Sequence, residues 1–461
     1  MKKTILLIIS ILIGTIGCFA QAKQSAKAKT GAAQVSTAQN TQSQLRVGAA
    51  KLNVTPKLEE LGANSLGIHD SVYIRAIVID NGETRSALVT VAGNQNEQSW
   101  KASTERMEKE LGIPVKNVVL SSTHSHSVGR IAALDEKIFT TVKKAVDKLQ
   151  PAKIGWGTGV SYINVKRDII DPKTRTWWEG ANYDGPSDKK VYVITFKALD
   201  DTPIAVYYNY AMHAVIMGQF DMVSGCVPGA TSRYIEDSFN NKIVAVWSSG
   251  AHGDQNPIYF QQTFDLRDIR IKEYASRGID ISNSMPPGGT GLNRKDPVVQ
   301  RLMHEQELIN DAMGVMLGEE VKHVMRGVDR WLDKAEIKAS QEVISLPGRR
   351  RTNQGRGGIE GTYEDADPVT IRIGVLMIGN IVLGTVNGEV YNAIGTQFMK
   401  ESPYARTMMV TIANGSATTG YIPDDASFGM NVFEVLSSRV KPGYAERGII
   451  DGILNQMEKL K

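Results

Sequence analysis

Two histidines of this sequence stand where a metal ion could be bound, directly after a predicted strand. His124 and His126 follow the apolar run Val118–Leu120, which is typical of a buried strand. Side chains two positions apart on a strand point to the same face, so the two imidazoles would leave the strand end together. Catalytic zinc sites typically combine about three His, Asp or Glu ligands with one water. The pair needs partners, because two loop histidines can also simply hydrogen-bond to their surroundings.

Other residues that can bind metals follow further predicted strands. Three of them are His213, Asp254 and Glu389, and Tyr421 adds a phenol in a segment of small residues. The ends of the strands form the usual ligand site of α/β proteins, so these side chains could meet there. A buried polar pair would also explain His213 and Glu389. Asp254 could be a turn residue, and Tyr421 could be a packed aromatic.

An ordered series of motifs links these residues to a known family. The motifs are Gly67-Ile68-His69, Ile74-Arg75-Ala76, Thr123-His124-Ser125-His126-Ser127, Asn209-Tyr210-Ala211-Met212-His213, Ser224–Gly229, Gly253-Asp254-Gln255-Asn256-Pro257, Asn387-Gly388-Glu389, Gly420-Tyr421-Ile422 and Phe433-Glu434. In this order they resemble the motifs of the neutral ceramidase family, zinc-dependent amidohydrolases that cleave N-acyl sphingosine. The resemblance covers roughly residues 46–461, and an ordered series is far more specific than any one motif.

The resemblance implies a role for each matching residue. The zinc ligands would be His124, His213, Glu389 and Tyr421, and His126 and Arg167 would contact the substrate or support the ligands. Bound Zn²⁺ lowers the pKa of its water from about 16 to near 7, which supplies hydroxide at neutral pH. A base then takes a proton from the water, and an acid returns one to the leaving group. His126 and His252 are the candidates for this proton transfer, and Asp254 is a candidate catalytic or supporting carboxylate. His252 could equally be an exposed loop histidine.

Several positions depart from the family's motifs at the substrate end of the site. Asn256 stands where ceramidases carry a serine proposed as nucleophile, Cys226 replaces an aspartate, and Ala251-His252 replace an asparagine and a small residue. An asparagine cannot act as an alkoxide nucleophile, but it can donate a hydrogen bond to a carbonyl or a developing oxyanion. Cys226 is expected to be a small buried thiol. The chain ends at Lys461, so we expect no counterpart of the family's C-terminal immunoglobulin-like domain.

These observations predict an exported zinc-dependent hydrolase that cleaves an amide or ester bond with metal-activated water. Loss of the serine leaves this scheme intact, because its nucleophile is water. The same loss puts ceramide as the substrate in doubt. A zinc-dependent glycan-processing enzyme is one alternative, and a non-catalytic secreted ligand-binding protein is the other.

Two segments outside the motifs bear on the substrate. Trp177, Trp178 and Tyr183 lie in a predicted loop, where they could stack on a sugar ring, hold an acyl chain or simply pin the loop. Four arginines occupy a Gly-rich stretch: Arg349, Arg350, Arg351 and Arg356. A solvated flexible loop is the default interpretation of this stretch, and an anion-binding lid is the sharper alternative.

Helices and strands must alternate along the chain to position these residues. Predicted strands cover residues 73–78, 86–91, 118–120, 191–196, 204–210, 243–247, 371–378 and 381–386. Predicted helices cover residues 98–111, 138–149, 298–324 and 449–460. We see no internal repeat and no clean linker after residue 46. We therefore expect one large α/β (mixed α+β) domain over residues 46–461, with layered sheets and helices and the metal site at strand ends.

The N-terminal residues have the pattern of an export signal. Lys2-Lys3 precede the apolar run Ile5–Ile16, which is too short to span a membrane comfortably. Ala20-Gln21-Ala22 then fits a cleavage site. We therefore predict a signal peptide over residues 1–22, a disordered linker over 23–45 and a periplasmic or secreted mature protein. Acylation of Cys18 as a lipoprotein anchor is the alternative.

Composition limits the partners of the mature protein. Lys and Arg number 53 against 49 Asp and Glu, a net charge of +4, which is too slight to argue for nucleic acid. A small-molecule, lipid or glycan substrate is the predicted partner. If Cys18 leaves with the signal, Cys226 is alone and no intrachain disulfide can form.

Overall fold

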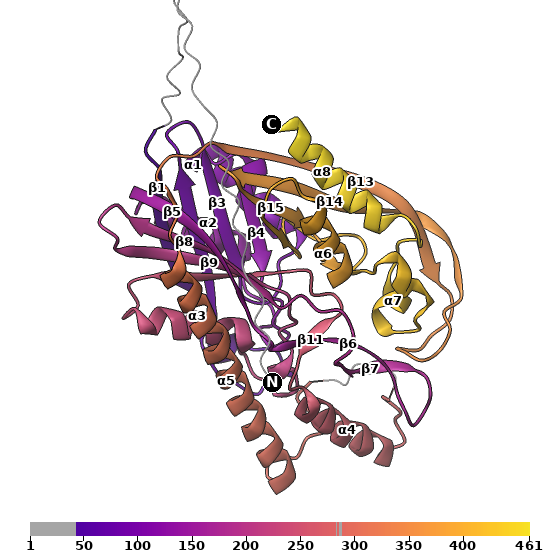
Figure 1. Ribbon diagram of the computed structural model, residues 1–461. Coiled ribbons are helices and arrows are strands. Elements are labelled where there is room, and N and C mark those ends of the chain that lie inside the picture. The colour runs from indigo at the N-terminus through magenta and orange to yellow at the C-terminus, as the bar shows by residue number, and fades with distance from the viewer. Residues whose placement is uncertain (1–42, 283, 285–287) are drawn as a thin grey trace, which may run out of the picture. The chain divides into compact units, whose positions relative to one another are not determined.

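The computed structural model describes residues 43–461 except 283 and 285–287, and a nine-stranded mixed sheet is the largest element of this described part (Figure 1). In spatial order its strands are β10 (Val244–Ser249), β9 (Pro203–Tyr210), β8 (Lys190–Ala198), β5 (Gln150–Val160), β1 (Arg46–Asn53), β2 (Tyr73–Asp80), β3 (Arg85–Val91) and β4 (Val118–Ser122), with β12 (Trp331–Leu332) paired to β5. Neighbouring β9 and β10 are parallel, as are β3 and β4. The ladder between β1 and β5 is only two residue pairs long.

The two edges of this sheet come together at one place. The Ser249 hydroxyl, at the end of β10, donates to the carbonyl oxygen of Ser122 at the end of β4, at 3.0 Å. The Thr90 hydroxyl on β3 likewise donates to the carbonyl oxygen of Trp247 on β10. Segments that follow β4, β9 and β10 therefore emerge close to one another.

A second sheet packs against the first. Its strands, in spatial order, are β13 (Ile337–Arg351), β14 (Tyr363–Ile378), β15 (Ile381–Val386) and β17 (Arg406–Val410). The core between the sheets combines Ile77, Leu88, Val119, Phe196 and Val246 from the first sheet with Leu376, Ile378, Leu383 and Met408 from the second. The alternate residues Val375 and Met377 belong to the core on the opposite face of β14, as the two-residue period of a strand requires.

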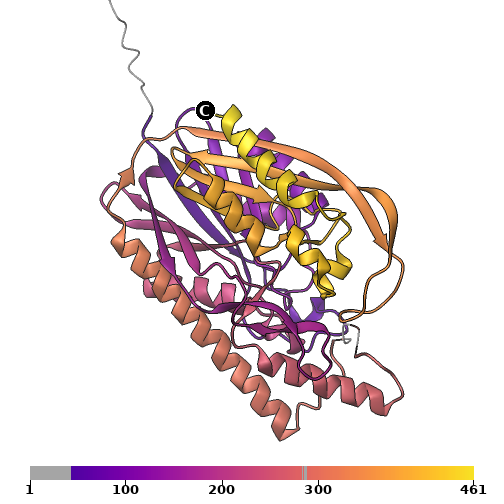
Figure 2. The same cartoon turned by 45° about the vertical axis from the view of Figure 1, so that its right-hand side comes forward.

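Helices cover the outer faces of both sheets, which gives four layers in the order helix, sheet, sheet, helix (Figures 1 and 2). On the first sheet lie α1 (Glu97–Leu111), α2 (Leu134–Val146), α3 (Cys226–Ser238) and α5 (Pro297–Gly327). On the second sheet lie α6 (Asn392–Glu401) and α8 (Ala445–Lys459). The remaining helices are α4 (Gln261–Ser276) and the short α7 (Phe433–Ser437).

Two small sheets complete the fold beside the strand ends. The first joins β11 (Gln255–Pro257), β6 (Asn164–Ile170) and β7 (Trp177–Asn182). The second pairs β16 (Glu389–Val390) with β18 (Tyr421–Ile422) in parallel, so that Glu389 stands opposite Tyr421. These short strands carry several of the predicted site residues.

The predicted mixed α/β class with layered sheets and helices is confirmed. Two segments predicted as loops are strands instead: Trp177 and Trp178 lie in β7, and Arg349–Arg351 form the end of β13. Within the described part of the chain, no helix is both long and apolar enough to cross a membrane. The predicted signal peptide, and the linker up to residue 42, lie outside the described residues. Leu45, the last residue of the predicted linker, is buried and bonds to main-chain groups of Asp333 and Ala152.

Candidate metal centre

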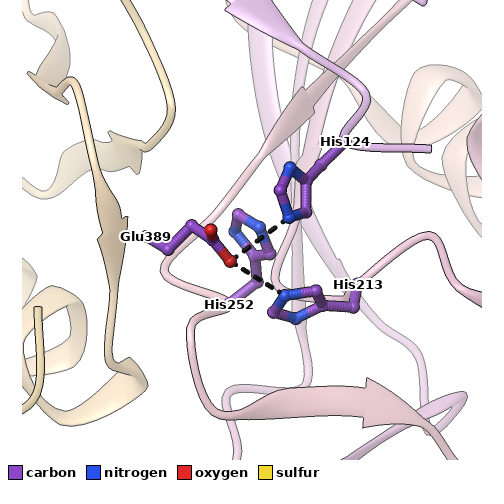
Figure 3. Close-up of side chains that lie close together, drawn as sticks. All are labelled: His124, His213, His252 and Glu389. Atoms are coloured by element: carbon purple, nitrogen blue, oxygen red, sulfur yellow. Dashed lines mark hydrogen bonds and ion pairs between the residues drawn. The ribbon is translucent and has the colours of Figure 1, made fainter. Parts of the chain in front are cut away.

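Four side chains from four separate segments meet where the strands of the first sheet end (Figure 3). They are His124 after β4, His213 after β9, His252 after β10 and Glu389 in β16, and one possible ligand atom of each lies within 4.8 Å of those of the others. A carboxylate oxygen, Oε2 of Glu389, lies 3.2 Å from Nε2 of His124 and 3.1 Å from Nε2 of His213. This donor set of three imidazoles and one carboxylate is of the kind that holds zinc and other divalent transition metals.

The histidine rings are fixed by contacts at their other nitrogen. Nδ1 of His213 lies 3.1 Å from the carbonyl oxygen of Gln255, and Nδ1 of His252 lies 2.9 Å from that of Gly250. A carbonyl oxygen only accepts, so each of these rings carries its hydrogen on Nδ1 and presents a lone pair at Nε2. Nδ1 of His124 has a similar contact, 2.8 Å from Oδ1 of Asn94. Metal-bound histidines are commonly oriented in this way.

Burial keeps two of these imidazoles neutral and leaves the carboxylate charged. Desolvation lowers the pKa of His252 to about 4 and that of His213 well below its usual range, and the charge of Arg167 lowers the latter further. Burial alone would raise the pKa of Glu389, but the facing His124 outweighs it and holds that pKa well below the ordinary value. Neutral imidazoles and an ionised carboxylate are the protonation states that metal binding requires.

One nitrogen of the cluster has no hydrogen-bond partner in the described part of the chain. Nε2 of His252 is buried and makes no hydrogen bond to any described residue. A buried polar atom without a partner is unfavourable by about 1–3 kcal/mol. Because Nδ1 of His252 already donates, this lone pair and that of His213 face the carboxylate of Glu389 with no hydrogen between them. A cation placed among them would satisfy all these groups, so the residues present fit a metal ion.

The main chain around the cluster is tightly constrained. His124 adopts φ = 57°, in the left-handed region that is unfavourable for residues other than glycine. Gly253 lies so close to β16 that a Cβ there would stand 2.6 Å from the carbonyl oxygen of Glu389. The absence of a side chain at residue 253 therefore lets the loop that carries His252 approach Glu389.

Two further predicted residues flank the cluster. The Tyr421 hydroxyl lies 3.5 Å from Nε2 of His213, and burial raises the pKa of this phenol well above its usual range. Nε2 of His126 lies 3.4 Å from Nε2 of His124, and the His126 ring also lines a cavity of about 620 Å³. This cavity is bounded by segments around residues 60–65 and 218–223. His126 thus borders both this cavity and the cluster.

Asn256 is held in a network of charged side chains rather than pointing freely at the cluster. Its Oδ1 accepts from Arg167 at 3.2 Å, and its Nδ2 donates to Glu179 at 3.0 Å. Arg167 also pairs with Glu434 at 2.5 Å and lies over the Tyr421 ring. The serine position of the family's motif is thus occupied by an amide whose two ends are already bonded.

Asp254 is not brought to the cluster. Its Oδ2 accepts from Nζ of Lys166 at 2.8 Å, and its Oδ1 accepts from the main-chain nitrogen of Asn392 at 2.8 Å. These contacts tie the residue 250–257 loop to β6 and to the start of α6.

The structure thus brings His124, His213 and Glu389 together and adds His252 to them, with His126 and Tyr421 at the edge. Sequence reasoning did not single out Glu179 or Asn94. Glu179 lies between Trp178 and Tyr183, a stretch that drew attention for its aromatics alone, and Asn94 carried no signal.

Comparisons with known proteins agree with this picture. No family model matches the chain. The neutral ceramidase of Drosophila pseudoobscura pseudoobscura is 23% identical over 318 residues, which cover 61% of this chain and 43% of that protein. The neutral ceramidase of Drosophila melanogaster is 23% identical over 223 residues, which cover 41% and 32%. The matches therefore span less than half the length of these curated relatives.

Solved ceramidase structures have the same fold. A structure described as a ceramidase complexed with C2 superposes with a TM-score of 0.68 at 14% identity, over 90% of this chain and 76% of that one. The neutral ceramidase from Pseudomonas aeruginosa gives a TM-score of 0.66 at 15% identity, over 90% and 75%. The predicted resemblance to neutral ceramidases is confirmed in sequence and in fold.

Proposed function

We propose that this protein is a metal-dependent hydrolase that cleaves an N-acyl amide or an ester with metal-activated water. His124, His213, His252 and Glu389 would hold the metal, with Zn²⁺ as the expected ion. The observation that carries the proposal is that the lone pairs of the buried His213 and His252 face the partly buried carboxylate of Glu389. The likeness to neutral ceramidases supports the reaction class.

When bound, the metal would lower the pKa of a water and polarise the scissile carbonyl. His126 is placed to hold the proton released, because its Nε2 lies beside the cluster and its ring lines the cavity. Burial keeps the Tyr421 hydroxyl protonated, so it can donate a hydrogen bond to a substrate oxygen. His252 would then complete the ligand set in place of Tyr421.

We propose that Asn256 helps to shape the substrate end of the site and takes no part in breaking the bond. With Oδ1 and Nδ2 bonded to Arg167 and Glu179, its amide holds these two charged side chains in place. We propose that Arg167 and Asp254 likewise position the loop and the substrate end of the site. No hydroxyl nucleophile is required, because water attacks.

The test combines metal analysis with an activity screen. Metal content of the purified protein would be measured by mass spectrometry for the wild type, His124→Ala and Glu389→Ala. His323→Ala, which changes an exposed histidine of α5, is the matched control. We expect about one metal ion per chain in the wild type and control, and none in the other two variants.

Hydrolysis would then be measured on N-acyl lipids, esters and glycans, before and after chelation. Chelator-sensitive release from an N-acyl or ester substrate supports the proposal. Turnover of glycans alone would assign a glycan-processing enzyme instead. Bound metal without turnover on any class would assign a ligand-binding protein.

Export is proposed on the pattern of residues 1–22. N-terminal sequencing of the protein from its native host would test it. A first residue near Ala22 or Lys23 supports cleavage of a signal peptide, whereas a first residue at Cys18 supports a lipoprotein.

A further inference from the structure

A second cavity, beside α7 and the end of β13, is lined by arginines. Its volume is about 520 Å³, and four arginines are among the residues that line it: Arg350, Arg351, Arg356 and Arg439. Phe433 and Leu436 of α7 add an apolar wall. No aspartate or glutamate is found among the described residues that line it.

Carboxylates balance only part of this positive charge. Arg350 pairs with Glu364, and Arg356 pairs with Glu179 at 3.2 Å. By contrast, Arg439 has no carboxylate within 4.0 Å among the described residues, and its Nη1 donates to the carbonyl oxygen of Thr418 at 3.2 Å.

Arg351 is the second guanidinium without a carboxylate within 4.0 Å in the described part of the chain. Its Nε donates to Oδ1 of Asn353 at 2.8 Å, and its Nη1 donates to the carbonyl oxygen of Gly355. The neighbouring Arg349 is buried behind α7, where it donates to the carbonyl oxygens of Val435 and Ser438. Positive charge held by neutral oxygens produces a positive potential that favours an added anion.

The Arg351 side chain is also held in place before any ligand arrives. Contacts from Arg351 to Asn353 and Gly355 hold its guanidinium at the end of β13. A planar guanidinium binds carboxylate, phosphate and sulfate oxygens with paired hydrogen bonds, and a fixed one loses little conformational entropy in doing so. The cavity is therefore organised for an anionic group that carries an apolar or flat portion against Phe433.

Contacts connect this cavity to the metal centre. The Phe433 ring packs edge-on against the ring of Tyr421, with centroids 5.5 Å apart, and Tyr421 reaches His213. On the other side, Glu179 pairs with Arg356 and also accepts a hydrogen bond from Asn256. A ligand bound among the arginines would thus lie along the side of the metal centre that carries Tyr421 and Asn256.

We infer that the arginine-lined cavity binds an anionic group, such as a phosphate, sulfate or carboxylate, of the molecule that the metal centre cleaves. The substrate class is then an acidic amide or ester rather than a neutral ceramide. This identification of the ligand as substrate rests on the proposed function, whereas the anion site itself does not.

Binding would be measured by calorimetry on the full protein, with and without chelation of metal, using inorganic phosphate, hexyl phosphate and glucose 6-phosphate. Sodium chloride would hold the ionic strength constant. Arg439→Gln and Arg351→Gln remove the two guanidinium groups that lack a carboxylate. Arg301→Gln, which removes an exposed guanidinium of α5, is the control. Melting curves would show that each variant folds.

We expect saturable binding to the wild type whether or not metal is present, about tenfold weaker binding in each cavity variant, and no change in the control. Tighter binding of hexyl phosphate would indicate an acidic lipid, and tighter binding of glucose 6-phosphate an acidic saccharide. Absence of saturable binding to the wild type, or unchanged affinity in Arg439→Gln, would overturn the inference. A protein that binds these anions yet hydrolyses nothing would retain the anion site and contradict the proposed function instead.

Discussion

At the scale of single residues, His252 is the side chain whose position changes the chemistry most. The resemblance assigned the fourth ligand position to Tyr421. The His252 ring, however, is buried, and its Nε2 lies at the cluster without a hydrogen-bond partner among the described residues. The Tyr421 hydroxyl stays at the edge, 3.5 Å from Nε2 of His213. The fourth ligand beside His124, His213 and Glu389 is therefore either His252 or Tyr421, and a substitution at each residue can distinguish the two.

We predict that His252→Ala weakens metal binding by more than about 100-fold, because a direct ligand contributes more than the 10–100-fold of a supporting group. Tyr421→Phe should keep the affinity within about tenfold of the wild type. Competition with a chromophoric chelator measures both. If Tyr421→Phe weakened metal binding more than His252→Ala did, Tyr421 rather than His252 would be the fourth ligand.

The second residue-scale prediction concerns Asn256. Asn256→Ser restores the residue of the family's motif but removes the contacts to Arg167 and Glu179, which are buried or partly buried. We expect the free energy of unfolding to fall by about 1–3 kcal/mol and hydrolysis of N-acyl lipids not to rise. Urea unfolding and a ceramide assay measure the two effects. Asn455→Ser, at an exposed position of α8, should change stability by less than about 0.5 kcal/mol. A gain of ceramidase activity in Asn256→Ser would show that the network does not prevent the serine from acting.

At the scale of elements, the metal centre depends on how closely the residue 250–254 loop approaches β16. Main-chain bonds fix this approach, since Gly253 N donates to the carbonyl oxygen of Val390 at 2.8 Å. Gly250 N likewise donates to the carbonyl oxygen of Tyr210 at 2.9 Å, which ties the same loop to β9. The loop thus carries His252 on a support that is bonded on both sides.

Gly253→Ala should separate this loop from β16, because the new Cβ would stand 2.6 Å from main-chain oxygen of Glu389. We expect stability to fall by about 1–3 kcal/mol and metal affinity to fall with it, as both His252 and Glu389 move. Thermal unfolding and chelator competition measure these effects. Gly420→Ala is the matched control, since its Cβ would meet nothing within 4 Å and its residue adjoins Tyr421. Equal effects in the two variants would mean that the close approach is not what matters.

A buried ion pair joins β2 to α3 and offers a second prediction at this scale. Arg75 bonds both carboxylate oxygens of Glu236, at 2.8 and 3.1 Å, and both side chains are buried. Burial alone would raise the pKa of Glu236, but Arg75 outweighs it and the pKa is lowered. Stability from this pair is therefore present above the unfolded pKa of about 4.3 and is lost as the pH falls through the folded value.

Arg75→Met should lower the free energy of unfolding at pH 7 by about 3–5 kcal/mol, because the buried Glu236 carboxylate would keep Lys51 but lose its buried positive partner. The variant should also lose less stability than the wild type when acidified below pH 4. Arg46→Met removes a half-exposed arginine from neighbouring β1 and should change stability by about 1 kcal/mol or less. Denaturant titrations over a pH series would measure the free energy of unfolding of both variants and the wild type. A similar small change in both variants would mean that the buried pair adds little.

At the scale of the whole molecule, sequence patterns predicted several strands that bury both faces and missed β13, which does not. Strands such as β2, β9 and β15 read as apolar runs because both of their faces lie in a core. By contrast, β13 is half-exposed along most of its length and has no clear alternation. Helix α3 was missed because Pro228 and Gly229 interrupt its first turn, where a proline is in fact tolerated.

Site residues could be predicted where their position depends on local sequence, and not where it depends on distant contacts. His124, His213 and Glu389 could be predicted because each follows a strand that is evident from its own residues. The inward turn of the His252 ring depends on bonds to Gly250 and Thr411 and on the contact of Gly253 with β16. The contacts with Thr411 and β16 join segments more than 100 residues apart, which a local pattern cannot reveal.

A metal bound at this centre would hold together distant parts of the chain, because its ligands come from residues 124, 213, 252 and 389. An ion that binds the folded chain alone stabilises it by about 2.7 kcal/mol at a free concentration 100 times its Kd. For a chain of this length we expect chelation to lower the Tm by about 3 °C. Calorimetry before and after chelation, followed by addition of Zn²⁺ in excess, measures the loss and its reversal. His124→Ala should melt at the same temperature with or without chelator, whereas His323→Ala should respond as the wild type does. An equal chelator effect in His124→Ala would place the stabilising metal elsewhere in the molecule.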